Sequence, residues 1–254
     1  MKLIILAAGE GKRLRPYTEN KPKCLVDICG KSILERTLIT AKKVGIEDIL
    51  IVGGHKYEKL KEYKKKIIFN RKFAYTNMVV SLFCAQDYFG DELLISYGDI
   101  IYSPEVLRKL IDSKSNISVI LDNNWLDYWK KRFNDPLKDA ENLSIRDNKI
   151  VKIGGKAKKI SHIESQYIGL LLFRKSGIEQ LKEMFKIAQL ECENGCLDFG
   201  SAKNLKTMFM TDFLQGMIDR NVEISPVFIN GKWAEIDNKK DLKIAEQFVK
   251  KGII

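Results

Sequence analysis

The chain has 254 residues, of which 45% are hydrophobic, so it can form one large domain with a sizeable core. Its formal net charge is +11, but the lysines are scattered in pairs and triplets, which favours solvated helix faces and argues against nucleic acid as a partner. No segment is apolar enough to cross a bilayer, and the first residues lack the pattern of a secretory signal. We therefore expect a cytoplasmic protein without a membrane partner.

The first half of the chain alternates predicted strands and helices with short connections. Apolar runs without alternation predict buried strands, and the segments between them carry helical periodicity. The helix after Ser32 has the clearest boundaries, because Glu35 follows three residues later as in a capping box and Gly45 is a natural C-cap. Strands are predicted at residues 3–7, 48–54, 66–70, 92–99 and 116–122, and helices at 32–44, 57–65, 77–88 and 104–113.

The second half begins with a different pattern. Asp147 and Asn148 separate two short apolar runs and predict a β-hairpin over residues 143–154. Because apolar strands alternating with helices are typical of parallel sheets covered on both faces, we predict one α/β domain over residues 1–254, with an inserted lobe at about 122–165. Later strands are predicted at residues 166–173, 223–229 and 233–236, and helices at 177–191, 207–219 and from 238 onwards.

A glycine-rich turn and three basic residues follow the first predicted strand, in the stretch LIILAAGEGKRLRP. Open parallel sheets bind ligands beyond the carboxyl ends of their strands, and Gly9 and Gly11 would let the backbone approach a phosphate closely. Neither a P-loop nor a dinucleotide-binding fingerprint fits, because no glycine stands at the required distance before Gly11 and position 14 is leucine. A plain tight turn is the alternative, but a bound polyphosphate would also explain the positive charge.

Two aspartates follow predicted strands. Asp99 ends the strand LLISYGD, and Asp237 ends the short strand WAEID. Either residue could be only a helix cap or a turn former. Beside a phosphate-binding loop, however, they could hold Mg²⁺ against a triphosphate, since hard cations take oxygen ligands. The reaction would then be phosphoryl or nucleotidyl transfer.

These segments resemble the signature of a known family. LAAGEGKRLRP followed by KPK is similar to the L-A-A-G-x-G-x-R-L-x-P…K-P-K signature of the nucleotidyltransferases that activate sugar phosphates and phosphocholine. FAYTNMVVSLFCA, KRFNDPLKDAENL and GKWAEID resemble the short cytidylyltransferases that act on phosphocholine, 2-aminoethylphosphonate or, in capsule synthesis, glutamine phosphate. The resemblance spans residues 3–242. It implies a Rossmann-like three-layer sandwich around a mostly parallel mixed sheet, with CMP transferred from CTP to a small phosphate- or phosphonate-bearing acceptor.

The resemblance also implies roles for individual residues. Lys23 would bridge the α-phosphate and the acceptor, and Arg13 would neutralise the leaving β- and γ-phosphates. Asp99 and Asp237 would bind Mg²⁺. The nucleotide would be held by Leu6, Ala8, Gly9 and Gly11 of the loop and by Thr76, Asn77 and Ser81, which would shape a pocket for cytosine.

The acceptor-binding residues are predicted from side-chain chemistry. Basic side chains of the inserted lobe could hold a phosphate or carboxylate, and its tryptophans could pack on a substrate cation. The alternative is that these side chains only fasten the lobe to the sheet. Carboxylates near predicted strand and helix ends could take an ammonium group, although one of them could equally be an ordinary helix carboxylate. The candidates are Trp125, Trp129, Lys130, Arg132, Glu164 and Asp212.

Other classes of protein share parts of this pattern. A sugar-1-phosphate uridylyl- or thymidylyltransferase is the nearest alternative. A non-catalytic phosphate- or nucleic-acid-binding protein would explain the charge but would not need Asp99 and Asp237 together. A glycosyltransferase of similar fold would carry a D-x-D motif, whereas Asp99 precedes two isoleucines. The sequence leaves open which acceptor is used and whether the protein forms a homodimer.

Overall fold

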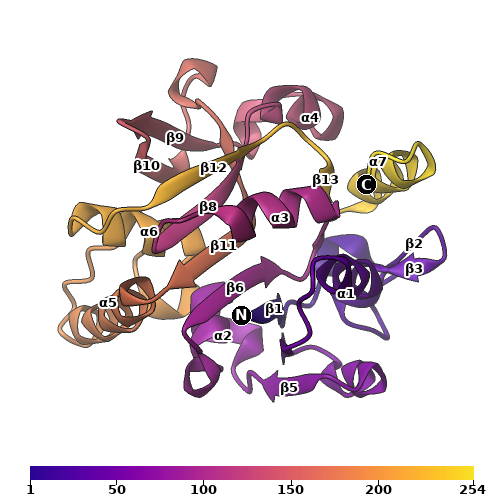
Figure 1. Cartoon of the computed structure of the whole chain (residues 1–254), viewed down its shortest axis with the longest axis horizontal. Helices are drawn as coiled ribbons and strands as arrows, with labels where there is room; N and C mark the ends of the chain where they lie inside the picture. The colour runs from indigo at the N-terminus through magenta and orange to yellow at the C-terminus, as the bar shows by residue number, and fades with distance from the viewer.

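Seven strands form the central sheet of the computed structural model, which describes residues 1–254 (Figure 1). Neighbouring strands pair in parallel except around β11, which runs antiparallel to both β6 and β8. The predicted α/β fold with a mostly parallel mixed sheet is therefore confirmed. In spatial order the strands are β12 (Ser225–Ile229), β8 (Ile117–Asp122), β11 (Gln166–Arg174), β6 (Glu92–Tyr97), β1 (Lys2–Ala7), β4 (Ile49–Gly53) and β5 (Lys66–Phe69).

Apolar cores of similar size lie on the two faces of this sheet, because successive side chains of a strand point to opposite sides. Leu3 and Ile5 of β1 belong to one core, of 38 buried residues, while Ile4 and Leu6 belong to the other, of 31. Both faces are thus covered by helices, as the three-layer arrangement requires. The first core includes residues of α1 (Ile33–Lys43), α3 (Pro104–Asp112) and α7 (Lys239–Lys250), and the second includes residues of α2 (Met78–Phe83), α5 (Ser176–Glu193) and α6 (Met210–Asp219).

The predicted helices differ from the observed ones mainly in type and at their ends. The capping box of α1 is present, since the Ser32 hydroxyl accepts the N–H of Glu35 and the Glu35 carboxylate accepts the N–H of Ser32. The segment predicted as a helix over 57–65 forms a 3₁₀-helix at Tyr57–Tyr63. The helix predicted over residues 77–88 is shorter in the structure, where α2 ends at Phe83.

The segment between β8 and β11 contains one helix that the sequence did not predict and the hairpin that it did. The helix is α4 (Trp125–Arg132), and the hairpin consists of β9 (Glu141–Arg146) and β10 (Lys149–Lys156). Asp147 and Asn148 have φ values of 50° and 56°, which suits the tight turn of a two-residue hairpin loop. We interpret these elements as the inserted lobe of a single domain; Figure 1 shows them together at one end of the sheet.

Small strand pairs extend the connections beyond the main sheet. β7 (Ile100–Tyr102) pairs antiparallel with β13 (Trp233–Glu235), and β2 (Asp27–Ile28) pairs with β3 (Lys31–Ser32). None of the helices is both long and apolar enough to span a membrane.

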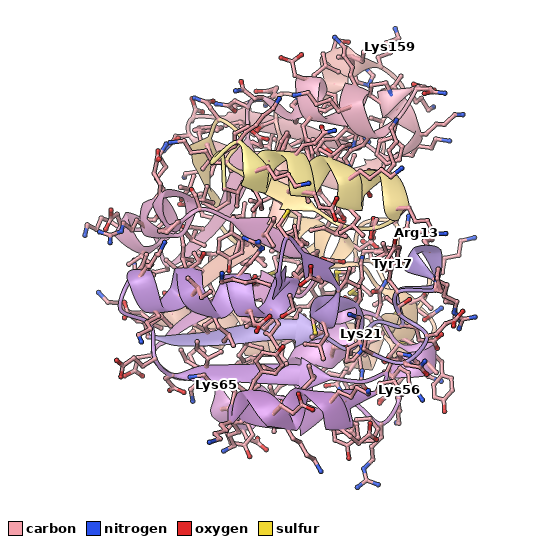
Figure 2. All side chains as sticks on the ribbon, turned by 90° about the vertical axis from the view of Figure 1, so that its right-hand side faces the viewer. Arg13, Tyr17, Lys21, Lys56, Lys65 and Lys159 are labelled. Atoms are coloured by element: carbon pink, nitrogen blue, oxygen red, sulfur yellow. The ribbon has the colours of Figure 1, made fainter.

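The basic side chains are distributed over the surface. Figure 2 shows Lys56, Lys65 and Lys159 at separate places on one face of the molecule. Arg13 and Lys21 extend in the same view from the loop that follows β1. This loop therefore places basic side chains at the carboxyl end of β1, the edge of the sheet where α/β proteins bind their ligands.

Candidate active site

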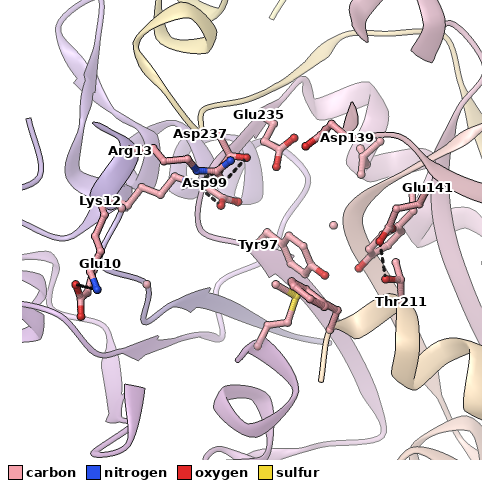
Figure 3. Close-up of a pocket in the computed structure, with 18 of the residues that line it drawn as sticks. Glu10, Lys12, Arg13, Tyr97, Asp99, Asp139, Glu141, Thr211, Glu235 and Asp237 are labelled. Carbon is pink, nitrogen blue, oxygen red and sulfur yellow. Dashed lines mark hydrogen bonds and ion pairs between the residues drawn. The ribbon is translucent and has the colours of Figure 1, made fainter. Parts of the chain in front are cut away.

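A cavity of about 600 Å³ opens at the carboxyl ends of β1 and β6 (Figure 3). One side is formed by the loop after β1, from Gly9 to Arg13, together with Lys23. The opposite side is formed by the beginnings of β9 and β11 and of α6. The cavity thus lies between the sheet and the inserted lobe, where the sequence predicted ligand binding.

Gly11 is required by the backbone conformation and by a close contact. Its φ is +63°, a left-handed value, and an added Cβ would lie 3.0 Å from the Cβ of Lys23. The Thr18 hydroxyl donates a hydrogen bond of 2.8 Å to the Gly11 carbonyl and fixes the loop. Gly9 differs, because its Cβ position would face open space. Gly11 therefore sets the loop against Lys23, while Gly9 leaves the backbone accessible from the cavity.

Lys23 lies between two aspartates at the base of the cavity. Its Nζ is 2.7 Å from Asp99 Oδ2 and 2.5 Å from Asp237 Oδ1, and Arg13 Nη2 is 3.0 Å from Asp237 Oδ2. Burial alone would lower the pKa of Lys23, but the two carboxylates outweigh it and hold the pKa above its usual range. The same ion pairs lower the pKa of Asp237 against the opposing effect of its burial.

Strand pairing brings the two aspartates together, although 138 positions separate them in the sequence (237 − 99 = 138). β7 and β13 pair so that Glu235 is opposite Ile100. The backbone N–H of Ile236 then donates a hydrogen bond of 2.9 Å to the Asp99 carbonyl. The structure therefore joins the predicted pair Asp99 and Asp237 to Lys23 and Arg13.

A third carboxylate, Glu235, belongs to this cluster, and sequence reasoning missed it. One oxygen each of Asp99, Glu235 and Asp237 lies within 4.8 Å of the others, and Asp99 Oδ1 is buried without a hydrogen-bond partner. Burial raises the pKa of Glu235, and Arg132 opposes this effect. Three carboxylates with an unpaired oxygen fit a hard divalent cation. Glu235 precedes Asp237 by two residues in an extended segment, so the spacing already placed both side chains on one side.

Arg132 supports these carboxylates from inside the protein. Its side chain is fully buried, with Nη1 2.6 Å from Glu235 Oε2 and Nε 3.1 Å from Asp241 Oδ1. Asp241 in turn accepts the backbone N–H of Asp237 at 3.1 Å. Burial would lower the pKa of Arg132, but Glu235 and Asp241 keep it charged. Arg132 thus connects α4 of the inserted lobe to the carboxylates. This agrees with the alternative stated above, in which this side chain fastens the lobe to the sheet and does not bind the acceptor.

A smaller cavity of about 130 Å³ adjoins the loop. It brings together residues of the strand and loop at β1 and residues in or just before α2 that the sequence predicted to hold the nucleotide. Asn70, which was not predicted, organises it: its Nδ2 donates to Thr76 Oγ1 and to Ser81 Oγ, both at 3.0 Å. The predicted residues that line this cavity are Leu6, Ala8, Gly9, Thr76, Asn77 and Ser81.

The far end of the larger cavity is acidic and aromatic, and its acidic residues were not predicted. Asp139 and Glu141 contribute carboxylates, and Thr211 Oγ1 donates a hydrogen bond of 3.1 Å to Glu141 Oε1. Burial raises the pKa of Glu141 to about 7. Trp129 is also present here, and its Nε1 donates to Asp139 Oδ2 at 3.1 Å. Figure 3 shows Glu141 and Thr211 across the cavity from Arg13 and Asp99.

Comparison with known proteins identifies the family. Residues 3–148 match the MobA-like NTP transferase domain. The chain belongs to this family. It is 36% identical to the CTP:phosphoglutamine cytidylyltransferase of Campylobacter jejuni over 96% of this chain and 98% of that protein. It is also 39% identical to the choline-phosphate cytidylyltransferase of Streptococcus pneumoniae, over 40% of this chain and 46% of that protein.

Two solved structures share the fold of this nucleotidyltransferase over 98% of its length. The inositol-1-phosphate CTP transferase from T. maritima has a TM-score of 0.74 at 22% identity and is covered to 95%. The CTP:phosphocholine cytidylyltransferase from Streptococcus pneumoniae has a TM-score of 0.69 at 21% identity and is covered to 98%. The predictions of a nucleotidyltransferase family, fold and enzyme class are thus confirmed.

The nucleotidyltransferase does not bring every predicted acceptor residue to the cavity. Trp129 lines the cavity. Trp125 is buried behind Trp129 and packs edge-on against it, with 6.0 Å between the ring centroids. Lys130 is exposed outside the cavity, because the opposite face of α4 turns inward. Glu164 is exposed beyond the start of β11, where its carboxylate accepts the N–H of Ile145.

Asp212 has a structural role in the nucleotidyltransferase. Its carboxylate accepts hydrogen bonds from the N–H of Phe209, the N–H of Ser201 and the Ser201 hydroxyl. It therefore caps the start of α6, which explains why the helix predicted from residue 207 begins at Met210. Asp212 lines an adjoining cavity of about 290 Å³, which shares Asp139, Glu141 and Phe209 with the larger one, and it is not among the residues lining the larger one itself.

Proposed function

We propose that this nucleotidyltransferase transfers CMP from CTP to a small acceptor that carries a phosphate or phosphonate, with release of pyrophosphate. The observation that carries this proposal is the position of Lys23 between Asp99 and Asp237, directly beside the loop that Gly11 shapes. The smaller cavity supports nucleotide binding, because the polar side chains of Thr76, Asn77 and Ser81 line it directly beside the loop. Relatives of this chain act with CTP on phosphoglutamine and choline phosphate.

In the proposed reaction an acceptor oxygen attacks the α-phosphorus of CTP in line with the departing pyrophosphate. The new bond joins this oxygen to the α-phosphorus, and the bond to the β-phosphate oxygen breaks, so pyrophosphate leaves with the electron pair. The attacking oxygen is already anionic near neutral pH and needs no general base. Lys23 supplies a buried positive charge where the acceptor and the α-phosphate meet, and Arg13 supplies one for the departing phosphates.

The three clustered carboxylates would hold Mg²⁺. Asp99, Glu235 and Asp237 supply oxygen ligands, and the buried Oδ1 of Asp99 has no protein partner. When bound there, the cation would neutralise phosphate charge and help to orient the triphosphate. Arg132 and Asp241 hold Glu235 and Asp237 in position for this role.

The proposal is tested by measuring pyrophosphate release with Mg²⁺ while CTP, UTP, dTTP, ATP and GTP are crossed with several acceptors. Phosphocholine, phosphoglutamine, 2-aminoethylphosphonate, inositol 1-phosphate and glucose 1-phosphate cover the relevant acceptor classes. We expect release with CTP and with at least one of the first four acceptors. Release only with UTP or dTTP and glucose 1-phosphate would replace the proposal by a sugar-phosphate nucleotidyltransferase.

A further inference from the structure

The basic residues that line the cavity all lie at one end, where Arg13 and Lys23 form ion pairs with aspartates, whereas the other end has carboxylates and no basic lining residue. All the lysines and arginines that line it, Lys12, Arg13 and Lys23, belong to the glycine loop or the segment after it. The far end is lined by Asp139 and Glu141 and by no basic residue, although Arg132 lies behind the lining with Nη1 3.9 Å from Asp139 Oδ2. A ligand that bridges the two ends would therefore match the cavity best if it were negative at one end and positive at the other.

Glu141 is held firmly by its neighbours. Gln166 clamps the Glu141 backbone, since its Oε1 accepts the Glu141 N–H at 3.1 Å and its Nε2 donates to the Glu141 carbonyl at 2.7 Å. Thr211 fixes one oxygen of the side chain. Thr211 is itself fixed against the hairpin, because a Cβ on Gly154 would lie only 2.8 Å from that of Thr211. The second oxygen of Glu141 has no hydrogen-bond partner in the protein and remains available to a ligand.

The ionised carboxylate of Glu141 destabilises the folded protein when no ligand is bound. It is largely withdrawn from water, and no lysine or arginine forms an ion pair with it, which is why its pKa is raised to about 7. Tyr167 also lines the cavity, and its buried hydroxyl lacks a hydrogen-bond partner. Groups that cost stability in the free protein are characteristic of positions that a ligand satisfies.

The surroundings of the carboxylates suit a nitrogen cation. The rings of Trp129, Tyr167 and Phe209 line the same end of the cavity. Aromatic faces attract ammonium groups, and a carboxylate completes the charge match. The named relatives provide an independent indication, because choline phosphate carries a quaternary ammonium group and phosphoglutamine carries an amino group.

We propose that Glu141, assisted by Asp139, binds the positively charged nitrogen of the acceptor and so determines which phosphates this enzyme uses. The inference rests on the proposed function and narrows its acceptor class to phosphates or phosphonates with an ammonium group at the opposite end. It assigns this role to Glu141 in place of Glu164 and Asp212, the residues favoured by the sequence.

The test compares acceptor pairs that differ only in the cation. Phosphocholine is paired with 3,3-dimethylbutyl phosphate, in which carbon replaces the nitrogen, and phosphoglutamine with its counterpart lacking the α-amino group. The discrimination ratio is kcat/KM for the charged acceptor divided by kcat/KM for the neutral one, both with CTP. Wild type, Glu141→Gln and Glu141→Asp are measured. Glu164→Gln is the matched control, since it removes a nearby carboxylate outside the cavity.

We expect wild type to favour one charged acceptor, and Glu141→Gln to lower its ratio by about 10- to 100-fold, the value of a charge-assisted contact. Glu141→Asp should fall between them, and Glu164→Gln should match wild type. Because each ratio compares two acceptors on one enzyme preparation, partial unfolding cancels. An unchanged ratio in Glu141→Gln would overturn the inference, and so would a wild-type enzyme that uses charged and neutral acceptors equally well. In both cases CTP-dependent turnover would leave the proposed function intact. No turnover with CTP and any acceptor would overturn both.

Discussion

The two ends of the cavity are built in different ways. At the phosphate end the charges compensate one another, because Lys23 and Arg13 form ion pairs with Asp99 and Asp237. At the acceptor end Glu141 has only the neutral partner Thr211 within hydrogen-bond distance. The first end is thus preorganised without a ligand, whereas the second end holds a carboxylate that no basic side chain of the protein pairs with. Catalysis and acceptor choice should therefore respond differently to mutation.

The largest effect is expected at the phosphate end from Lys23→Ala. The change removes the buried positive charge between the acceptor and the α-phosphate and leaves Asp99 and Asp237 facing each other. We predict that kcat for pyrophosphate release falls by about 10³-fold or more. Circular dichroism should still report a folded protein, and the exposed Lys31→Ala should behave as wild type. Near-normal turnover in Lys23→Ala would contradict the role of Lys23.

Arg132→Met should weaken both the fold and the phosphate end. Removing the guanidinium leaves Asp241 buried without its charge partner and releases Glu235. We expect a loss of about 3–5 kcal/mol in the free energy of unfolding, measured by urea denaturation. Lys131→Met, at the exposed neighbouring position, is the control. A loss below about 1 kcal/mol would show that the buried network does not support the carboxylates.

Gly11→Ala and Gly30→Ala form a matched pair. Both glycines have positive φ, +63° and +82°, so alanine should cost each about 1 kcal/mol of backbone strain. Only Gly11 would bring the new Cβ to 3.0 Å from Lys23, whereas Gly30 faces open space. We predict a clear loss of kcat in Gly11→Ala alone, while the melting temperature falls in both variants and at least as much in Gly11→Ala. Equal activities would show that the loop does not position Lys23.

The smallest effect on the chemical step is expected at the acceptor end, where the prediction concerns the stability of the protein without ligand. The folded-state pKa of Glu141 is about 7, above the ordinary value of 4.5, so the folded state binds more protons between these limits. Its destabilising effect is therefore absent below about pH 4.5 and complete above about pH 7. We predict that Glu141→Gln is more stable than wild type by up to about 3 kcal/mol at pH 8 and nearly equal to it near pH 4.5. Thermal melts at both pH values provide the measurement.

Other charged groups surround Glu141 and bear on this prediction. Asp139 and Asp212 raise the pKa of Glu141 by repulsion, and the hydrogen bond from Thr211 lowers it. Lys156 is paired opposite Glu141 in the hairpin. Replacing Lys156 by methionine in the Glu141→Gln background should leave the pH dependence unchanged. A stability difference in Glu141→Gln that persists at pH 4.5 would indicate a packing effect instead of a titration.

The difference between the two ends also explains what the sequence could predict. The fold and the phosphate end depend on local signals: apolar runs that end at Gly9, Asp99 and Asp237, and a glycine turn with adjacent basic residues. Long-range pairing brought these groups together as expected, because all of them follow strands. Glu235 was recoverable from its two-residue spacing to Asp237.

The acceptor end could not be predicted in this way. Glu141, Gln166 and Thr211 come from three elements, and only the packing of the hairpin against α6 and beside β11 brings them together. Charged residues near strand ends gave no indication of which would point inward. Glu164 was therefore chosen although its side chain lies outside the cavity.

The most direct test of the account follows an oxygen atom through the reaction. The enzyme is given CTP, Mg²⁺ and phosphocholine or phosphoglutamine whose phosphate oxygens are labelled with ¹⁸O, and the products are analysed by ³¹P NMR and mass spectrometry. The account predicts unlabelled pyrophosphate and a CDP-linked product with ¹⁸O in the bridge between the two phosphorus atoms. Labelled pyrophosphate, or a product without acceptor oxygen in the bridge, would contradict attack by the acceptor on the α-phosphorus of CTP.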